Sequence, residues 1–208
     1  MNLARLVLLG VVCVAGVARG DALSLLLADG DLIFHTSKSA QSEAVAIATG
    51  SKWTHMGLVL FEQGELWVYE AVQPVKRTKL REWVARGAGG RAIVRRLREA
   101  STVLTPSVQR ELHKIARSFV GRPYDLQFRW DDDQLYCSEL VYKAYERAAN
   151  VRIGKTQRAG ELQLASPLVQ KKLKQRYGKK LQTFDASQTV ITPQAMFDDP
   201  ALVTVFAN

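Results

Sequence analysis

Strand-like and helix-like segments are largely separated along this chain of 208 residues. The first half holds short apolar runs of the strand type, with short predicted helices at 39–49 and 79–86 between them. Three later segments begin with a hydroxyl residue followed by proline, which is typical of a capped helix start. This segregation predicts an α+β domain with helices packed on an antiparallel sheet. The predicted strands are 31–34, 56–61, 66–72 and 91–97, and the helix starts are Thr105-Pro106, Ser166-Pro167 and Thr192-Pro193.

The composition agrees with a single globular domain. Hydrophobic residues make up 47% of the chain and charged residues 24%, which excludes a disordered or fibrous protein. The net charge of +9 is spread along the chain and does not form a basic tail. Two cysteines are too few for a disulfide framework or a thiolate zinc site. We therefore expect neither a metal nor a cofactor.

The first 20 residues have the layout of a secretory signal peptide. Arg5 precedes an apolar run at 6–17, and small residues follow it. The run is too short to span a bilayer comfortably, although an uncleaved anchor is the alternative. The residue before Cys13 is not small, which argues against lipoprotein processing. The sequence thus predicts a signal peptide at 1–20, one domain at 21–208, and a periplasmic or secreted protein.

Removal of such a signal peptide leaves Cys137 as the lone cysteine of the chain. It opens a predicted helix at 137–149, where the free N–H groups and the helix dipole stabilise a thiolate. Its own backbone N–H is also able to point at a developing oxyanion. A buried, inert cysteine is the structural alternative.

A thiol nucleophile needs a base, and the chain offers three histidines. His113 lies off the apolar stripe of its helix, so we expect it on the solvated surface. His35 ends the first predicted strand and is left undecided. His55 immediately precedes the apolar run 56–61 and is the best candidate.

A predicted hairpin brings a carboxylate to His55. If Gln63-Gly64 is a two-residue loop, Gly57 pairs with Glu70, and His55 becomes a diagonal neighbour of Glu70 on the same face. A carboxylate in such an apolar run needs a partner, which an imidazole supplies. The pattern predicts a Cys–His–Glu arrangement for thiol catalysis. A one-residue slip would send Glu70 to the other face, and the alternative is a buried cysteine, a surface histidine and an edge glutamate.

Three segments resemble the papain-like cysteine hydrolases of the NlpC type. That group has Gly-x-Pro-Tyr followed by Asp-Cys-Ser at a helix start, and Tyr136 replaces the aspartate here. Histidine precedes cysteine, as in the circularly permuted branch that includes YiiX-like hydrolases. The segments are VGRPYD at 120–125, YCSELV at 136–141 and THMGLV at 54–59, and the YiiX-like match adds 30–34, 41–42, 69–72 and 193–197.

The resemblance implies a circularly permuted papain-like fold, in which the Cys137 helix packs on a small antiparallel sheet carrying His55 and Glu70. It implies hydrolysis of amide bonds through a thioester, in peptidoglycan stem peptides or related peptides. Tyr124 matches the motif tyrosine and is expected near the thiol, where it helps the oxyanion. Tyr136, beside the nucleophile, is a further candidate for substrate or oxyanion contact. Trp53 is either a wall of the substrate cleft or an ordinary core or rim aromatic residue.

Two other readings of function stay open: a lipid-directed acyl hydrolase or acyltransferase, and a non-catalytic module that binds wall peptides. The three aspartates at 131–133 predict a solvated turn, because calcium loops space their ligands alternately. The basic segment 171–180 predicts a solvated helix face, with contact to an anionic wall polymer or lipid surface as the alternative. A signal peptide argues against a nucleic-acid partner.

Overall fold

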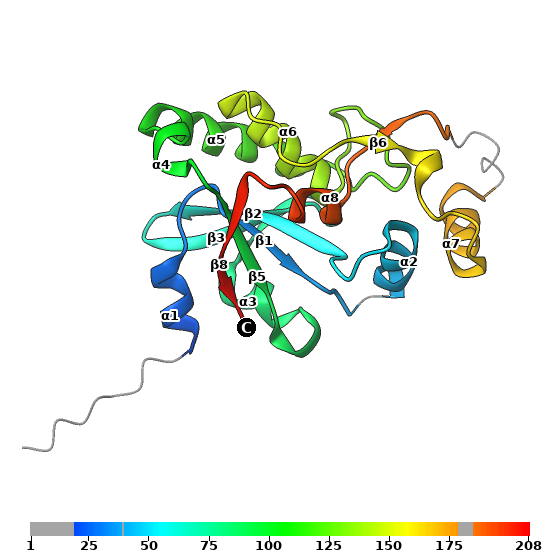
Figure 1. Ribbon diagram of the computed structural model, residues 1–208, viewed down its shortest axis with the longest axis horizontal. Helices are drawn as coiled ribbons and strands as arrows, with labels where there is room; N and C mark the ends of the chain where they lie inside the picture. The colour runs from blue at the N-terminus through cyan, green and yellow to red at the C-terminus, as the bar shows by residue number, and fades with distance from the viewer. Residues whose placement is uncertain (1–18, 39, 179–184) are drawn as a thin grey trace, which may run out of the picture.

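The computed structural model describes residues 19–38, 40–178 and 185–208 (Figure 1). The predicted signal peptide therefore lies almost wholly outside the described residues, and only its last two positions appear, at the start of the first helix. Among the described residues, no helix combines the length and the apolar character needed to cross a membrane. The helices are α1 (Arg19–Leu26), α2 (Ala40–Thr49), α3 (Leu80–Ala85), α4 (Ala100–Val103), α5 (Pro106–Phe119), α6 (Cys137–Ala149), α7 (Pro167–Tyr177) and α8 (Pro193–Phe197), with 3-10 turns η1 (Ala88–Gly90) and η2 (Ala159–Glu161).

A six-stranded sheet forms the centre of the fold, in the order β4-β3-β2-β1-β5-β8, and every neighbouring pair is antiparallel. The C-terminal strand β8 thus forms one edge and β4 the other. A second, two-stranded ribbon joins β6 and β7. The strands are β1 (Leu32–His35), β2 (His55–Glu62), β3 (Glu65–Glu70), β4 (Lys76–Lys79), β5 (Ile93–Leu97), β6 (Gln157–Arg158), β7 (Thr189–Val190) and β8 (Leu202–Ala207).

Both faces of the sheet are covered, as the alternation of side chains along β1 shows. Leu32 and Phe34 belong to the large core cluster beneath α5 and α6, whereas Ile33 belongs to a second cluster with Trp83 of α3. Figure 1 shows α5 and α6 side by side along one face, with α2 and α7 together beyond one end of the sheet. The observed architecture is the α+β, helix-on-sheet class that the segregated elements predict.

The predicted helix starts agree with the structure, although only two of the three are capped by their hydroxyl. Thr105 accepts a hydrogen bond from the backbone N–H of Val108, and Thr192 accepts one from Ala195. Ser166 precedes α7 without such a bond. A hydroxyl before proline therefore located each start, even where the capping bond itself is missing.

The hairpin of β2 and β3 has the predicted register. Phe61 lies opposite Leu66, Glu62 lies opposite Glu65, and the loop is Gln63-Gly64. Both loop residues have positive φ, 53° and 83°, as a type I′ turn requires. Gly57 is needed where β2 passes β3, because a Cβ there would lie 2.4 Å from Cγ1 of Val68. This register places Glu70 at the level of the first residues of β2.

Several features differ from the sequence expectations, among them the edge strand β8, which was not predicted. Strand β4, with the sequence KRTK, was not predicted because three of its four residues are charged, and it pairs with β3 only as the sheet edge. Helix α6 has the predicted bounds, but its burial is not confined to one apolar face. Ser138, Glu139 and Lys143 are buried along with the apolar residues. The Ser138 hydroxyl donates to the backbone carbonyl of Ile191, and the Lys143 ammonium donates to that of Asp131 in the 122–135 loop.

Candidate active site

Cys137 and His55 meet where the N-terminus of α6 reaches the beginning of β2. Cys137 is the first residue of α6 and is a buried free thiol. His55 is the first residue of β2, and its imidazole is hydrogen-bonded to the Cys137 side chain. The two residues lie far apart in the sequence but act as one hydrogen-bonded pair, in the arrangement that an activated thiol requires.

The other side of the imidazole contacts Glu70 of β3. His55 Nε2 lies 2.7 Å from Glu70 Oε2, and the glutamate side chain is fully buried whereas the histidine side chain is 12% exposed. Nε2 is the ring nitrogen that faces the carboxylate. The structure therefore brings together the three residues that the sequence singled out, in the order thiol, imidazole, carboxylate.

Three further donors surround the Glu70 carboxylate. The hydroxyl of Thr78 donates to Oε1 at 2.6 Å, and the indole N–H of Trp83 donates to Oε2 at 3.0 Å. The guanidinium of Arg86 also donates to Oε1. With His55, Glu70 has four partners, which compensate the cost of burying its charge. These donors come from β4, α3 and the end of α3, and no sequence motif pointed to any of them.

The pKa values of the pair reflect these contacts. Burial opposes the charged form of His55, but the hydrogen bonds and charges of Cys137 and Glu70 outweigh it and raise the pKa of His55 to about 9. Burial likewise opposes ionisation of Glu70, yet His55, Thr78 and Arg86 lower its pKa to about 2. The site thus favours a protonated imidazole beside an ionised carboxylate.

His35, left undecided by the sequence, is a second and different imidazole. Its ring stacks on Trp83, with centroids 4.0 Å apart and planes at 17°, and its centroid lies 5.3 Å from that of His55. Burial, together with the positive charges of His55 and Arg86, lowers the pKa of His35 to about 3. His35 is therefore neutral, and its ring packs against that of Trp83.

The two candidate tyrosines have different positions. Tyr136 precedes α6 and is buried, and its hydroxyl accepts a hydrogen bond from the backbone N–H of Ile191. Its ring, rather than its hydroxyl, faces the pocket beside Cys137. Tyr124 is half-buried and lines the same pocket as Cys137.

Trp53 is a core residue and does not wall a cleft. Its side chain is 7% exposed and packs against Phe34 and Phe197. It does not line either of the two pockets around the pair in the described part of the chain. Trp53 lies between two residues of the hydrophobic core because the turn into β2 carries it inward, so the core alternative is correct.

Helical periodicity predicted that His113 lies on the solvated surface, and that prediction is wrong. Its two ring nitrogens lie 3.0 Å from Asp29 and 3.3 Å from Glu62, and its side chain is 15% exposed. Burial raises the pKa of Glu62, but the hydroxyl of Tyr69 and the side chains of Arg117, His113 and Arg77 outweigh it and lower that pKa to about 2. His113 therefore belongs to a cluster of polar side chains that joins α5 to the β2–β3 hairpin.

The aspartates at 131–133 are not simply solvated. Asp132 pairs with Lys143 and Arg147 of α6, which lower its pKa to about 2 against burial, and Asp131 pairs with Arg129. In the described ranges, no group of three histidine, cysteine, aspartate or glutamate side chains is arranged to hold a metal. The acidic run therefore anchors the 122–135 loop to α6.

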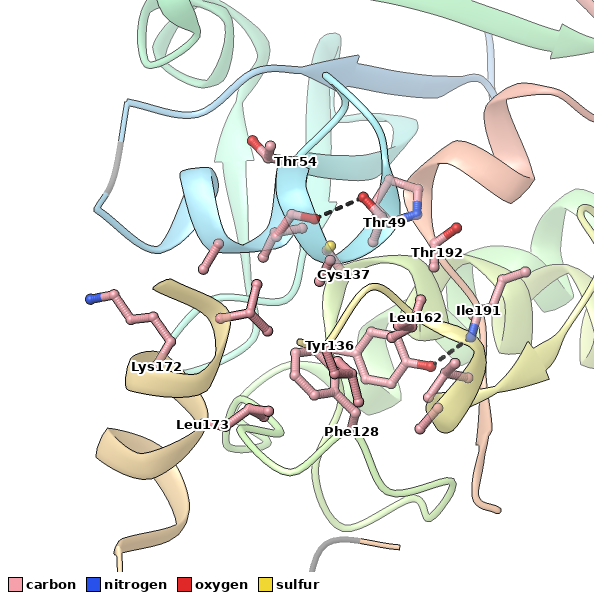
Figure 2. A pocket seen from close by; sticks show the side chains of 18 of the residues that line it. Thr49, Thr54, Phe128, Tyr136, Cys137, Leu162, Lys172, Leu173, Ile191 and Thr192 are labelled. Carbon is pink, nitrogen blue, oxygen red and sulfur yellow. Dashed lines mark hydrogen bonds between the residues drawn. The ribbon is translucent and has the colours of Figure 1, made fainter. Parts of the chain in front are cut away.

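An apolar pocket opens beside the Cys137 sulfur (Figure 2). Figure 2 shows Cys137 at its upper wall, with Phe128, Tyr136 and Leu173 below. Lys172 of the predicted basic face lies at its edge, so that face is not wholly solvated, and Lys179 and Lys180 lie outside the described residues. The apolar walls come from α2, α7 and the segment around β7, and they include Ala44, Val45, Ala48, Val169, Leu173, Val190 and Ile191.

Comparison with known proteins agrees with this geometry. The family model described as "Permuted papain-like amidase enzyme, YaeF/YiiX, C92 family" matches residues 26–206. The uncharacterized protein YiiX of Escherichia coli (strain K12) is 43% identical over 176 residues, which cover 85% of this chain and 84% of that protein.

A solved structure shares the fold. The crystal structure described as metalloprotein yiiX from Escherichia coli O157:H7 has a TM-score of 0.80 and 43% identity, covering 86% of this chain and 97% of that chain. The family match at 26–206 includes helix α6, strand β2 and the other strands of the sheet, up to the next-to-last residue of β8. The chain therefore belongs to the YaeF/YiiX family of permuted papain-like amidases.

Proposed function

We propose that this protein is a thiol hydrolase of amide bonds, with Cys137 as nucleophile, His55 as proton carrier and Glu70 as the residue that orients the imidazole. The observation that carries the proposal is the continuous contact from Cys137 through His55 to Glu70. A hydrogen-bonded nucleophile, base and orienting carboxylate is the arrangement by which unrelated folds activate a thiol or hydroxyl. Membership of an amidase family supports the same reaction class.

The reaction begins with attack of the Cys137 thiolate on the carbonyl carbon of the substrate. The C–S bond forms, and the tetrahedral intermediate collapses as the His55 imidazolium gives its proton to the leaving nitrogen. The C–N bond breaks, the amine departs, and a thioester remains on Cys137. Water then attacks the thioester, His55 takes its proton, and cleavage of the C–S bond releases the carboxylic acid and restores the thiolate–imidazolium pair.

The start of α6 supports stabilisation of the oxyanion. The first N–H groups of a helix have no acceptor within the helix, and the N-terminal end of its dipole is positive. Cys137 is the first residue of α6, so its own backbone N–H belongs to this group. We assign Tyr124 to the same role because it lines the pocket beside the thiol. Such donors act most strongly in a site that excludes water.

For the substrate, we propose peptide-type amides, with peptidoglycan stem peptides as the first class to test. The signal-peptide pattern of the N-terminus supports export to the periplasm or beyond, where wall peptides occur. Fusion of residues 1–20 to a reporter that is active only after export tests the localisation independently of the chemistry. Every step of the proposed reaction uses only the Cys137 thiol, the His55 imidazole and water, with Glu70 orienting the imidazole.

The apolar pocket favours a second candidate, hydrolysis or transfer of a fatty acyl group. Its walls are apolar side chains of α2 and α7, and Cys137 lies at its edge. An alkyl chain is stabilised there by burial, whereas the charged groups of a stem peptide find few partners. A hydrolase and an acyltransferase form the same thioester and differ only in the acceptor that resolves it.

One experiment distinguishes these candidates. Wild-type protein and Cys137→Ala are incubated with muropeptides, acyl lipids and simple peptides, and both protein and products are weighed by mass spectrometry. A peptidyl adduct on Cys137 supports the wall-peptide substrate, and a long-chain acyl adduct supports the lipid candidate. Measurable peptide binding without any adduct or product would overturn both and identify a non-catalytic binding module.

A further inference from the structure

A second pocket adjoins the apolar one. His55 lines this second pocket, whereas Cys137 lines the apolar pocket. Val45, Thr54 and Tyr124 line both, so the two pockets share a wall. The cysteine and the histidine therefore face two separate chambers that adjoin each other.

This division assigns the two halves of a substrate. In the proposed reaction, which the present inference presupposes, the acyl carbon bonds to the Cys137 sulfur and the leaving nitrogen takes its proton from His55. The scissile bond must then cross the boundary at Thr54 and Tyr124. The acyl part extends into the pocket of Cys137, and the leaving amine extends into the pocket of His55.

The charge that lines the second pocket is positive. Among its described lining residues, Arg86 carries the only permanent charge, and no carboxylate is present. Glu70 is fully buried behind His55 and is not part of the lining. The other polar lining includes Gln73 and the neutral His35.

Arg86 has donors to spare for a ligand. Its guanidinium has five N–H groups, and its side chain is 41% exposed although it also contacts Glu70. A guanidinium recognises a carboxylate through paired N–H donors, which an ammonium group does not reproduce. Arg86 is therefore placed both to hold Glu70 and to meet an anion that enters from the pocket.

We propose that the second pocket is the leaving-group site and that it selects an amine carrying a carboxylate, such as an amino acid or a peptide with a free C-terminus, through Arg86. The substrate class is then an N-acyl amino acid or N-acyl peptide with an anionic amine half. This assignment holds whether the acyl half is a peptide or a fatty acid, because the apolar pocket receives that half.

The reverse of amide cleavage tests the site without knowledge of the natural substrate. The ester p-nitrophenyl octanoate transfers its octanoyl group to Cys137 and releases p-nitrophenolate, which yields the acyl-enzyme. An amine bound in the leaving-group site then attacks the thioester: its C–N bond forms, the C–S bond breaks, and His55 takes the amine proton. Glycine and glycinamide, at equal concentrations of free base, give octanoylglycine and octanoylglycinamide, which mass spectrometry quantifies against octanoic acid.

The expected result is a preference for glycine over glycinamide at least fivefold greater than that of a free octanoyl thioester of N-acetylcysteine in solution. In Arg86→Gln this excess disappears. In Arg110→Gln, which removes an exposed positive charge of α5, the excess remains. Because the preference is a ratio within each variant, a slower reaction caused by the lost contact between Arg86 and Glu70 does not affect it. A wild-type ratio equal to that of the free thioester, or one unchanged in Arg86→Gln, would overturn the inference.

Failure of the proposed function is recognised separately. If no octanoyl adduct forms on Cys137, the ring signals of ¹⁵N-labelled histidines are followed by NMR during titration with glycylglycine and with glycylglycinamide. Shifts of the His55 and His35 signals with glycylglycine alone, lost in Arg86→Gln, sustain the anion site while the hydrolase proposal fails. Equal responses to both peptides, or none to either, reject the site as well.

Discussion

The indole N–H of Trp83 donates to the Glu70 carboxylate oxygen that also binds His55, at 3.0 Å and 2.7 Å respectively. One carboxylate oxygen therefore joins the imidazole to a fully buried residue of α3. The second oxygen is held by Thr78 and Arg86. The orientation of the imidazole thus depends on a helix on the face of the sheet opposite to the nucleophile helix.

Replacement of Trp83 by phenylalanine removes this N–H and keeps an aromatic ring against His35. A hydrogen bond to a charged group contributes about 1.5–3 kcal/mol, so kcat/KM should fall by roughly ten- to a hundredfold. Steady-state kinetics on Trp83→Phe measure this effect. Trp67→Phe is the matched control, because Trp67 of β3 packs against Arg77 and Lys79 of β4 and not against Glu70. The activity of Trp67→Phe should equal that of the wild type. Equal activity of both variants would show that Glu70 needs no support from α3.

The catalytic pair should behave as a unit in a double-mutant cycle. Cys137→Ala and His55→Ala should each reduce kcat by about a thousandfold or more, and the double variant should be no worse than either alone. Glu70→Gln should cost less, since it only orients and stabilises the imidazole. Circular dichroism shows whether each variant keeps its fold. Additive losses, or a Glu70→Gln variant as inactive as Cys137→Ala, would contradict these roles.

Turnover should decrease as pH rises through about 9, where the imidazolium of His55 loses its proton. Below that pH the proton is available for the leaving nitrogen. Glu70 is one of the groups that raise the pKa of His55, so Glu70→Gln should move the falling limb of the kcat/KM profile to lower pH. A pH–rate profile of wild type and variant checks the direction, and an unmoved limb would separate Glu70 from the titration of His55.

His35 should make the fold sensitive to acid. Burial, with the charges of His55 and Arg86, lowers its pKa from 6.5 to about 3, so the folded state resists the proton that the unfolded chain accepts. The stabilising contribution is complete above pH 6.5 and is lost as pH falls toward 3. His35→Phe keeps the stacking on Trp83 but does not titrate. Urea unfolding at several pH values should show wild type losing stability relative to His35→Phe as pH decreases, whereas a constant difference would falsify the assignment of a neutral His35.

The local patterns of the sequence predicted the hairpin, the helix starts and the meeting of His55 with Glu70. These depend on neighbours in sequence: two residues of turn chemistry at Gln63-Gly64 fix the register, and the register fixes the face. The pairing with Cys137 followed from the position of that residue at a helix start and from the family resemblance. Contacts between elements that are far apart in the sequence are not marked by any local sequence pattern of this kind.

Thr78, Trp83 and Arg86 illustrate what could not be predicted. Thr78 lies on an edge strand without an apolar alternation, and the other two lie on a short helix whose docking place depends on the finished sheet. The prediction for His113 was wrong for the same reason. Helical periodicity indicates which face of α5 a residue occupies, but it does not show that Asp29 and Glu62 contact that face in the folded chain. Tertiary ion pairs of this kind require the assembled fold.

The two-residue turn at Gln63-Gly64 has a consequence for how this protein tolerates change. The turn lies at the end of the hairpin opposite to His55 and Glu70, yet its length decides which face of the sheet each residue of β3 occupies. One inserted residue that shifted β3 along β2 by one position would place Glu70 on the opposite face of the sheet. Gly57 limits how the strands can adjust, because a side chain at that position would collide with Val68. A change in the length of this loop is therefore expected to alter the site, because the chain would form a sheet in which His55 no longer contacts the Glu70 carboxylate.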